Sequence, residues 1–336
     1  MSVTIKDVAA VVGLSPSTVS RAFGRPEKVD EATRRRIVAA ADELGYRPNL
    51  AARALNTGRT HCIGAILPDL ENPFFAGVLK GIEAAGDALG YQTIVADSGE
   101  NLDAERRAAA VLGPQVDGLL LCSPRLDDDE LLRINAQRPV VLVNRSVGTL
   151  PNVSFDSRSG MQQAVRHLVA LGHRSIGYAG GNLASRSARV RLAAFDEVAA
   201  DPSARFEGRV LGEFAPTFEG GGAAADQALT SGVTAAVVYN DMMAIGLLHR
   251  LLSYGVALPS RLSLVSFDNI PVSAMVTPSL TTVDLPRIES GRIAIELLHA
   301  ILTAEDDSTA PGSTLLPAQL VVRQSTAARA AAGAHA

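Results

Sequence analysis

The stretch TIKDVAAVVGLSPSTVSRAF, residues 4–23, carries the signals of two short helices joined by a tight turn. Thr4 is a favourable N-cap, and Asp7 stands three residues later, where a capping box needs an acceptor. The first helix is therefore expected over residues 5–12. Gly13 follows it and suits the left-handed position at which many helices end.

A second helix follows at once. Ser15 can cap it, Pro16 occupies the first helical position, which tolerates proline, and Gly24 with Pro26 stops it. This arrangement predicts a helix-turn-helix. The aliphatic residues expected to meet inside the corner, with one small residue that allows close approach, are Val8, Val12, Leu14, Val19 and Ala9.

A third helix is expected from Asp30 to the glycine at position 45. One of its faces carries Thr33, Ile37, Ala41 and Leu44. Three helices around one small core make a DNA-binding head, in which the second helix enters the major groove. The alternative is a helical hairpin that only packs on a larger domain. The residues of the head expected to contact DNA are Thr4, Ser15, Pro16, Ser17, Thr18, Ser20 and Arg21.

The charges are unevenly distributed along the chain. Residues 1–60 hold ten Lys and Arg against six Asp and Glu, a formal +4, so the remaining 276 residues sum to −8 within a total of −4. A basic N-terminal segment on an acidic protein suits contact of that segment alone with a polyanion, although many charged runs are simply solvated.

The segment YRPNLAARALNTGRT, residues 46–60, links the head to the rest. A helix over residues 49–57 would be too short to persist alone in water, so it is expected to order only when docked. Leu55 is the one large aliphatic residue after Leu50 in this segment.

The chain of 336 residues suggests two or three domains, and no apolar run approaches the roughly 20 residues that span a bilayer. The first residues lack the signals of secretion, and two cysteines suit a reducing cytoplasm, so a cytoplasmic protein without membrane contact is expected. The six histidines show no metal-ligand spacing. Neither a metal nor a cofactor is expected.

Motifs along nearly the whole chain resemble the lac repressor (LacI/GalR) family of bacterial transcription regulators. The head matches in IKDVAAxxGLSPSTVSRAF and TRRRIxxAAxELGYRPNxxARxL, followed by TGRT. The body matches, in the family's order, in PDLENPFFAGVLKGIE, VDGLLL, HLVALGHRSIGYAGG, NDMMAIG, SFDNIP, PSLTTV and LVVRQST.

The resemblance implies a role for the linker. In this family the linker forms a hinge helix that pairs with that of the dimer mate, and a leucine wedges into the minor groove at the operator centre. That role falls on Leu55, with Asn49, Ala52 and Arg53 close to the groove and backbone. Unstacking a base step costs a few kcal/mol, which the closer fit of a kinked groove offsets.

The body alternates apolar runs with amphipathic stretches, which favours parallel, doubly wound α/β sheets. Strands are expected over residues 62–67, 92–96, 118–122, 140–143, 175–179, 235–239 and 262–267. Helices are expected over residues 74–89, 104–112, 161–171, 186–199 and 242–254.

Two such units, joined near residues 156–158 and 284–287, make a bilobed, periplasmic-binding-protein-like body, which the resemblance also implies. The expected organisation is a head (1–46), a hinge and linker (47–60), a first lobe (61–156 and 287–316), a second lobe (157–286 and 317–326) and a disordered tail (327–336).

Ligands of open α/β sheets bind beyond the carboxyl ends of the strands, so polar residues at those ends are expected to face one cleft between the lobes. For each of them a strand-end turn or a helix cap is the alternative interpretation. The polar candidates are Asp69, Asn144, Arg145, Asp156, Asn240 with Asp241, and Asp268 with Asn269. The resemblance supports effector contacts at Phe74, Phe75, Arg191, Phe214, Asn240 and Asp268.

Enzyme signatures are weak. No G-x-S-x-G elbow and no phosphate-binding P-loop appears. EGGGAAAD, residues 219–226, resembles a dinucleotide fingerprint, but no clear strand is expected closely before it, so it is read as a loose helix start. Asp127, Asp128 and Asp129 are read as the acidic start of a helix.

The resulting prediction is a non-enzymatic, sequence-specific DNA-binding regulator, most simply a repressor. It binds a palindromic double-stranded operator as a homodimer, and a small effector in the cleft, a sugar or related metabolite, controls its affinity. The alternative is a cytoplasmic small-molecule (sugar) receptor without a specific role on DNA.

Overall fold

The structure, a computed structural model, describes residues 3–24, 28–46, 58–304 and 312–329. The chain forms two compact units. Residues 1–62 with 115–117 form one, and the remaining residues form the other. The expected hinge contacts at Asn49, Ala52, Arg53 and Leu55 lie outside the described residues.

The head contains the three expected helices, α1 Ile5–Val12, α2 Pro16–Gly24 and α3 Glu31–Leu44. The Asp7 carboxylate accepts hydrogen bonds from the Thr4 backbone N–H (2.8 Å) and hydroxyl (2.7 Å), which holds the start of α1. Gly13 has φ 68°, in the left-handed region that favours glycine, and its N–H bonds the carbonyl of Ala9. The helix-turn-helix prediction is confirmed.

The head core is small and aliphatic. Val8, Val19 and Ile37 are fully buried, one from each helix, and Ala9 is 3% exposed where α1 approaches its neighbours. Three short helices thus share one core, which is what stabilises helices too short to persist alone.

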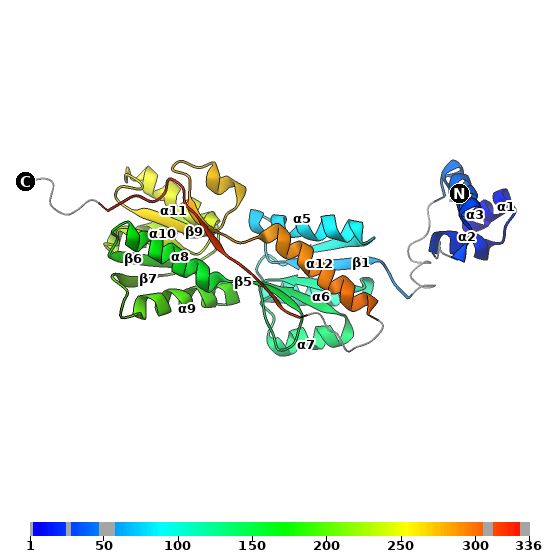
Figure 1. The fold of residues 1–336 in the computed structure, drawn as a ribbon, viewed down its shortest axis with the longest axis horizontal. Coiled ribbons are helices and arrows are strands. Elements are labelled where there is room, and N and C mark those ends of the chain that lie inside the picture. Colours follow the sequence, from blue (N-terminus) through cyan, green and yellow to red (C-terminus); the bar gives the residue numbers. More distant parts are fainter. Residues whose placement is uncertain (1–2, 25–27, 47–57, 305–311, 330–336) are drawn as a thin grey trace, which may run out of the picture. The chain divides into compact units, whose positions relative to one another are not determined.

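The body contains two six-stranded sheets, which Figure 1 shows as two separate lobes. The first sheet has the order β11-β5-β4-β3-β1-β2, and β11, β5, β4, β3 and β1 pair with one another in parallel. Its strands are β1 Cys62–Leu67, β2 Gln92–Asp97, β3 Gly118–Cys122, β4 Val140–Val143, β5 Asn152–Phe155 and β11 Thr314–Leu316.

The second sheet has the order β12-β10-β9-β8-β6-β7, parallel except for the antiparallel pairing of β10 with β12. Its strands are β6 Ser175–Gly181, β7 Glu207–Phe214, β8 Ala235–Val238, β9 Ser263–Asp268, β10 Thr281–Asp284 and β12 Gln319–Val321. The first lobe denotes the first sheet with its helices, and the second lobe denotes the second sheet with its helices.

Helices cover both sheets, as parallel strands require. The first lobe holds α5 Pro73–Ala88, α6 Leu102–Leu112, α7 Asp128–Gln137 and α12 Arg287–Thr303, and the short η2 Gly113–Gln115 directly follows α6 in the chain. The second lobe holds α8 Ser157–Ala170, α9 Arg186–Ala200, α10 Phe218–Thr230, α11 Asp241–Ser253 and the short η3 Pro271–Ala274.

The chain passes between the lobes three times, from β5 to α8, from β10 to α12 and from β11 to β12 (Figure 1). The α/β, doubly wound prediction is confirmed. Ala327 and Arg329 lie within the expected disordered tail, yet the Ala327 carbonyl accepts from His173 Nε2 and the Arg329 N–H donates to Leu171. These bonds tie the chain to the second lobe up to residue 329.

The expectation that no strand closely precedes residues 219–226 is wrong. β7 ends at Phe214, and α10 begins at Phe218. β7 is an edge strand in which only Leu211 is buried, so it lacks the apolar run that marks a buried strand. One glycine of this segment serves helix packing, because a Cβ on Gly221 would overlap the Met243 carbonyl of α11.

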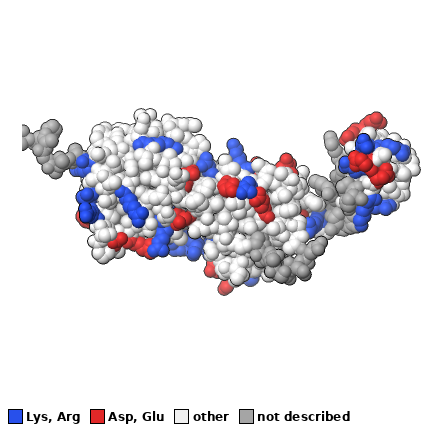
Figure 2. All heavy atoms as spheres, viewed as in Figure 1, with Lys and Arg blue, Asp and Glu red and all other residues white. Residues whose placement is uncertain are grey.

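None of the helices in the described part of the chain combines the length and the apolar character that crossing a bilayer requires. Figure 2 shows basic and acidic side chains interspersed over the visible face of the body.

Candidate functional sites

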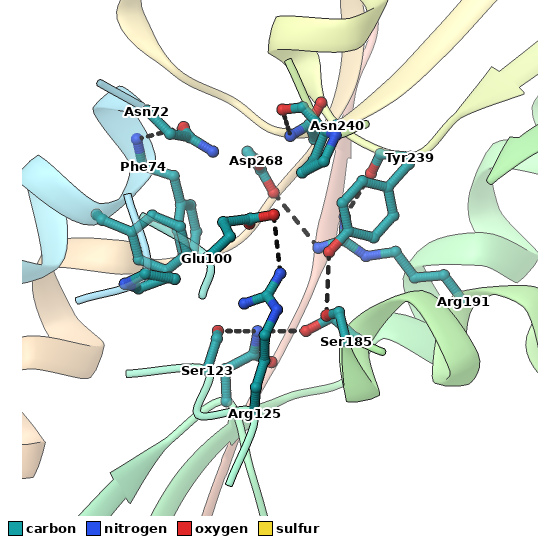
Figure 3. Close-up of a pocket in the computed structure, with 15 residues that line it drawn as sticks. Asn72, Phe74, Glu100, Ser123, Arg125, Ser185, Arg191, Tyr239, Asn240 and Asp268 are labelled. Atoms are coloured by element: carbon teal, nitrogen blue, oxygen red, sulfur yellow. Dashed lines mark hydrogen bonds and ion pairs between the residues drawn. The ribbon is translucent and has the colours of Figure 1, made fainter. Parts of the chain in front are cut away.

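A cleft lies between the two lobes of the body, at the carboxyl ends of the parallel strands (Figure 3). From the first lobe it receives Pro68 after β1, Glu100 after β2, Ser123 after β3 and Asn144 after β4. From the second lobe it receives Ser185, Arg191, Tyr239, Asn240 and Asp268.

The second-lobe wall is centred on an ion pair. Arg191 from α9 donates to Asp268 at the end of β9 (3.3 Å), with both side chains buried at 4% and 7% exposure. The Arg191 guanidinium also donates to the Tyr239 carbonyl and lies over the Tyr239 ring, 4.8 Å from its centroid. Its Nε is buried without a hydrogen-bond partner. The pair is thus held in a fixed geometry facing the cleft.

Burial raises the pKa of Asp268 to about 7; the Arg191 charge opposes that rise, and nearby Asp241 adds to it. Asp268 also has φ 107°, a strained backbone conformation for a residue other than glycine. Asn240 is less available, because its Oδ1 accepts from Met243 N–H as the N-cap of α11 and its Nδ2 donates to the Pro216 carbonyl.

The first-lobe wall is partly aromatic. Phe74 and Phe75, at the start of α5, contact each other edge to face with ring centroids 5.3 Å apart, and both line the cleft. Asn72 caps α5 by accepting from Phe74 N–H. Asn144 joins the lobes, because its Nδ2 donates to Ser123 of its own lobe (3.0 Å) and to Ser187 of the other (2.8 Å).

A second ion pair faces the cleft, and neither of its residues was expected there. Arg125 pairs with Glu100 at 2.8 Å, the two side chains being 9% and 27% exposed. Burial raises the pKa of Glu100, and the charge of Arg125 counters it. Both residues follow the ends of strands, β2 for Glu100 and β3 for Arg125, so the strand-end rule could have found them.

Six candidates line the cleft as expected, namely Phe74, Phe75, Asn144, Arg191, Asn240 and Asp268. Asp69 instead accepts from Glu71 N–H in a turn, Asp156 caps α8, and Phe214 packs beside the second-lobe core. Arg145 is buried and pairs with Asp128, away from the cleft. For Asp69 and Asp156, the turn and cap alternatives describe the structure.

Two neighbouring candidates also turn away. Asp241 is fully buried and accepts from the Ser266 hydroxyl, the Thr282 hydroxyl (2.7 Å) and Ile270 N–H (2.8 Å). Asn269 bonds Asp284 and Arg323. Both therefore stabilise the loops behind the cleft.

The cleft is narrow, with a cavity volume of about 30 Å³. A water needs roughly 10–15 Å³ by this kind of measure, so a sugar ring requires side chains or lobes to move apart. Ligand entry therefore requires the walls of the cleft to move.

The head presents a polar, exposed helix start. Ser15, Pro16, Ser17 and Arg21 are exposed, whereas Val19 points into the core. The Ser15 hydroxyl accepts from Thr18 N–H (3.2 Å), and Arg21 Nε donates back to the Ser17 carbonyl (3.2 Å). Thr4 is also exposed, and Thr18 and Ser20 are half-buried. Donors and acceptors thus gather on the face of α2 opposite the core.

Two family models match the chain. Residues 4–49 match bacterial regulatory proteins of the lacI family, and residues 165–326 match a periplasmic binding protein-like domain. The chain is 33% identical over 333 residues to the HTH-type transcriptional repressor CytR of Escherichia coli (strain K12), covering 97% of this chain and 96% of that protein. It is also 33% identical to the regulator GalR of the same organism, over 89% of each chain.

Two solved structures are similar over nearly the whole chain. The lac repressor dimer bound to operator and the anti-inducer ONPF has a TM-score of 0.85 at 29% identity, covering 98% of this chain and all of that one. A complex of the transcriptional regulator CelR with cellobiose has a TM-score of 0.71 at 29% identity, covering 96% and 99%.

Proposed function

The chain belongs to the lacI family of bacterial regulatory proteins, and on that premise we propose which of its residues bind operator and effector. The protein is a DNA-binding transcriptional repressor and not an enzyme. Its partners are an operator, a second copy of the chain and a small effector, as in the lac repressor dimer bound to operator and anti-inducer. Because bacterial operators lie in the cytoplasm, we place its action there.

We assign operator reading to the exposed face of α2. Ser17 and Arg21 supply donors that can reach base edges, and Pro16 supplies an apolar contact. Thr4, Ser15, Thr18 and Ser20 are assigned to the phosphate backbone or base edges near the helix start. From the family resemblance, Leu55 wedges into the minor groove, with Asn49, Ala52 and Arg53 beside it.

We assign effector binding to the cleft, and the buried Arg191–Asp268 pair is the observation that carries this assignment. A guanidinium beside a carboxylate presents donors and an acceptor at fixed spacing, which suits two adjacent hydroxyls of a sugar or a related metabolite. Phe74, Phe75 and Tyr239 add apolar faces, and Asn144 with Asn240 supplies amide groups at the walls.

The proposed regulation follows from the narrow cleft. A ring-sized ligand has to separate groups that now bond across it, including Asn144 and Ser187. An effector therefore binds the two arrangements of the lobes with different affinity, which is the requirement for shifting an equilibrium. In a homodimer on a palindrome, the spacing of the two heads then converts that shift into operator affinity.

The test is fluorescence-anisotropy binding to DNA flanking the coding region, at two salt concentrations, with a panel of sugars, nucleosides and purines. We expect tight, competitor-resistant binding to a palindrome that one compound alters. Binding that is weak, collapses with salt and ignores every compound would indicate a non-specific polyanion contact and favour the receptor alternative.

A further inference from the structure

A second hollow, of about 320 Å³, adjoins the cleft on the side of the edge strand β11. It shares Asn144 and Ser187 with the cleft and continues along β5, β11 and the start of α9. Its volume falls in the range of small-molecule sites. The proposed effector contacts use only its rim.

The lining of this hollow carries positive charge without a carboxylate. Its thirteen residues include two arginines, Arg145 and Arg186, while Asp and Glu are absent from them. The others are serine, threonine, asparagine and apolar side chains. Such a surface offers hydrogen-bond donors, and Arg186 adds a positive charge that no ion pair with the described residues neutralises.

Arg145 is buried at 8% exposure, and its Nε has no hydrogen-bond partner. One terminal nitrogen donates to Asp128 (2.6 Å) and to the Leu126 carbonyl (3.4 Å). Asp128 is 64% exposed, so water weakens its hold on the guanidinium. Arg145 lines the hollow, so its positive charge can attract an incoming oxyanion.

Two buried serines add donors at helix starts. Ser157, the first residue of α8, is 4% exposed, and its hydroxyl bonds no residue of the described part of the chain. Ser187, in the first turn of α9, accepts from Asn144 and keeps its own proton to donate. The N-cap of α9, Ser185, makes no side-chain capping bond, so backbone N–H groups of that turn also await an acceptor.

We propose that this hollow is an oxyanion site that binds a phosphate group, with Arg145, Arg186, Ser157 and Ser187 as its ligands. Arg186 is exposed at the rim and makes no ion pair with the described residues, so it can meet the anion first. The phosphate comes either from free inorganic phosphate or from a phosphorylated ligand whose other end occupies the cleft.

The test is calorimetric titration of the full-length protein with inorganic phosphate at constant ionic strength, which needs neither operator nor effector. Arg186→Gln is expected to weaken phosphate affinity at least tenfold without threatening the fold, because Arg186 is exposed. Arg145→Gln is also expected to weaken phosphate affinity at least tenfold. Arg209→Gln, on the exposed edge strand β7 and outside the hollow, is the matched control and should leave affinity unchanged.

Asp128→Asn gives a test in the opposite direction. It removes the carboxylate that competes for Arg145, so phosphate should bind more tightly, by threefold or more. Two results would overturn the site. One is equal phosphate affinity in the wild type and in both arginine variants. The other is that Asp128→Asn binds phosphate no more tightly than the wild type.

The two sources of phosphate are separated by Asp268→Asn in the cleft and by titration with glucose 6-phosphate and other sugar phosphates. If free phosphate is the ligand, Asp268→Asn should bind inorganic phosphate as tightly as the wild type does. If one ligand occupies both the hollow and the cleft, a sugar phosphate should bind more weakly to both Asp268→Asn and Arg186→Gln. An effector response that survives Arg186→Gln leaves the regulator function intact, so the two proposals fail separately.

Discussion

At the scale of single residues, the cleft shows how burial changes the chemistry of ordinary side chains. The Asp268 carboxyl is buried between Arg191 and the rest of the second lobe, so its proton is held far more tightly than in water. Both residues were expected in the cleft. Arg145 and Asp156 were expected there too, but Arg145 instead forms an ion pair with Asp128 and Asp156 caps α8.

The Asp268 carboxyl predicts a pH dependence of stability. Its pKa is raised to about 7, so between about pH 4 and 7 the folded state keeps a proton that the unfolded chain has lost. The contribution of Asp268 to the free energy of unfolding is therefore fully present below about pH 4. It falls as the pH rises to about 7, by at most about 1.4 kcal/mol per pH unit.

The measurement is urea unfolding of full-length protein at several pH values, at one protein concentration. Subtracting the profile of Asp268→Asn should leave a difference that declines from pH 4 to 7. Parallel profiles for the two proteins would show that Asp268 does not titrate in this window.

At the scale of elements, close helix pairs determine how each lobe packs. α10 and α11 approach so closely that a Cβ on Gly246 would overlap the Phe218 carbonyl. Within the GGG run at 220–222, Gly221 serves this packing, and a glycine kept for helix packing looks the same in the sequence as one kept for phosphate binding. Helix α12 was absent from the expected elements, although Ala294, Ile295 and Leu298 show helical spacing on its buried face.

Gly246→Ala is expected to destabilise the protein by about 1–3 kcal/mol, because the two helices would have to part. Gly222→Ala on α10 is the matched control. A Cβ there meets nothing within 4 Å, so the change should be neutral or stabilise the helix by about 1 kcal/mol. Denaturant midpoints of both variants check this, and equal losses would argue against tight α10–α11 packing.

At the scale of the whole molecule, function depends on coupling between a head that reads DNA and a body that binds a ligand. The three chain crossings between the sheets, at β5–α8, β10–α12 and β11–β12, allow the lobes to change their separation while remaining connected. The described residues of the head have their own core, so substitutions in the cleft should leave head folding unchanged.

Two substitutions separate the coupled functions. Leu55→Ala should weaken specific operator binding at least tenfold and leave effector affinity nearly intact, because the proposed minor-groove wedge is lost. Arg191→Ala should do the reverse, since it removes the guanidinium from the cleft. Anisotropy with operator and calorimetry with the effector identified from the panel measure both; parallel loss of the two activities in Leu55→Ala would contradict the separation.

The sequence by itself determined the helices of the head, the alternation of strands and helices in the body and the family. These depend on local signals: caps such as Thr4 with Asp7, the turn at Gly13 and runs of buried aliphatic residues. β7 has only one buried residue and β10 is polar, so neither carries those signals. Pairing with strands from distant segments makes them strands. Thr281 and Thr282, for example, are buried in β10 by bonds to Ser325 and Asp241.

Only the tertiary structure decided which strand-end residues face the cleft. Every parallel strand ends at the same edge, so sequence position cannot tell Asp268, which points at Arg191, from Asp156, which turns back to cap its own helix. The Glu100–Arg125 pair and the oxyanion hollow likewise arise from segments far apart in the chain. Their charges acquire meaning only when folding excludes water and brings their partners within hydrogen-bonding distance.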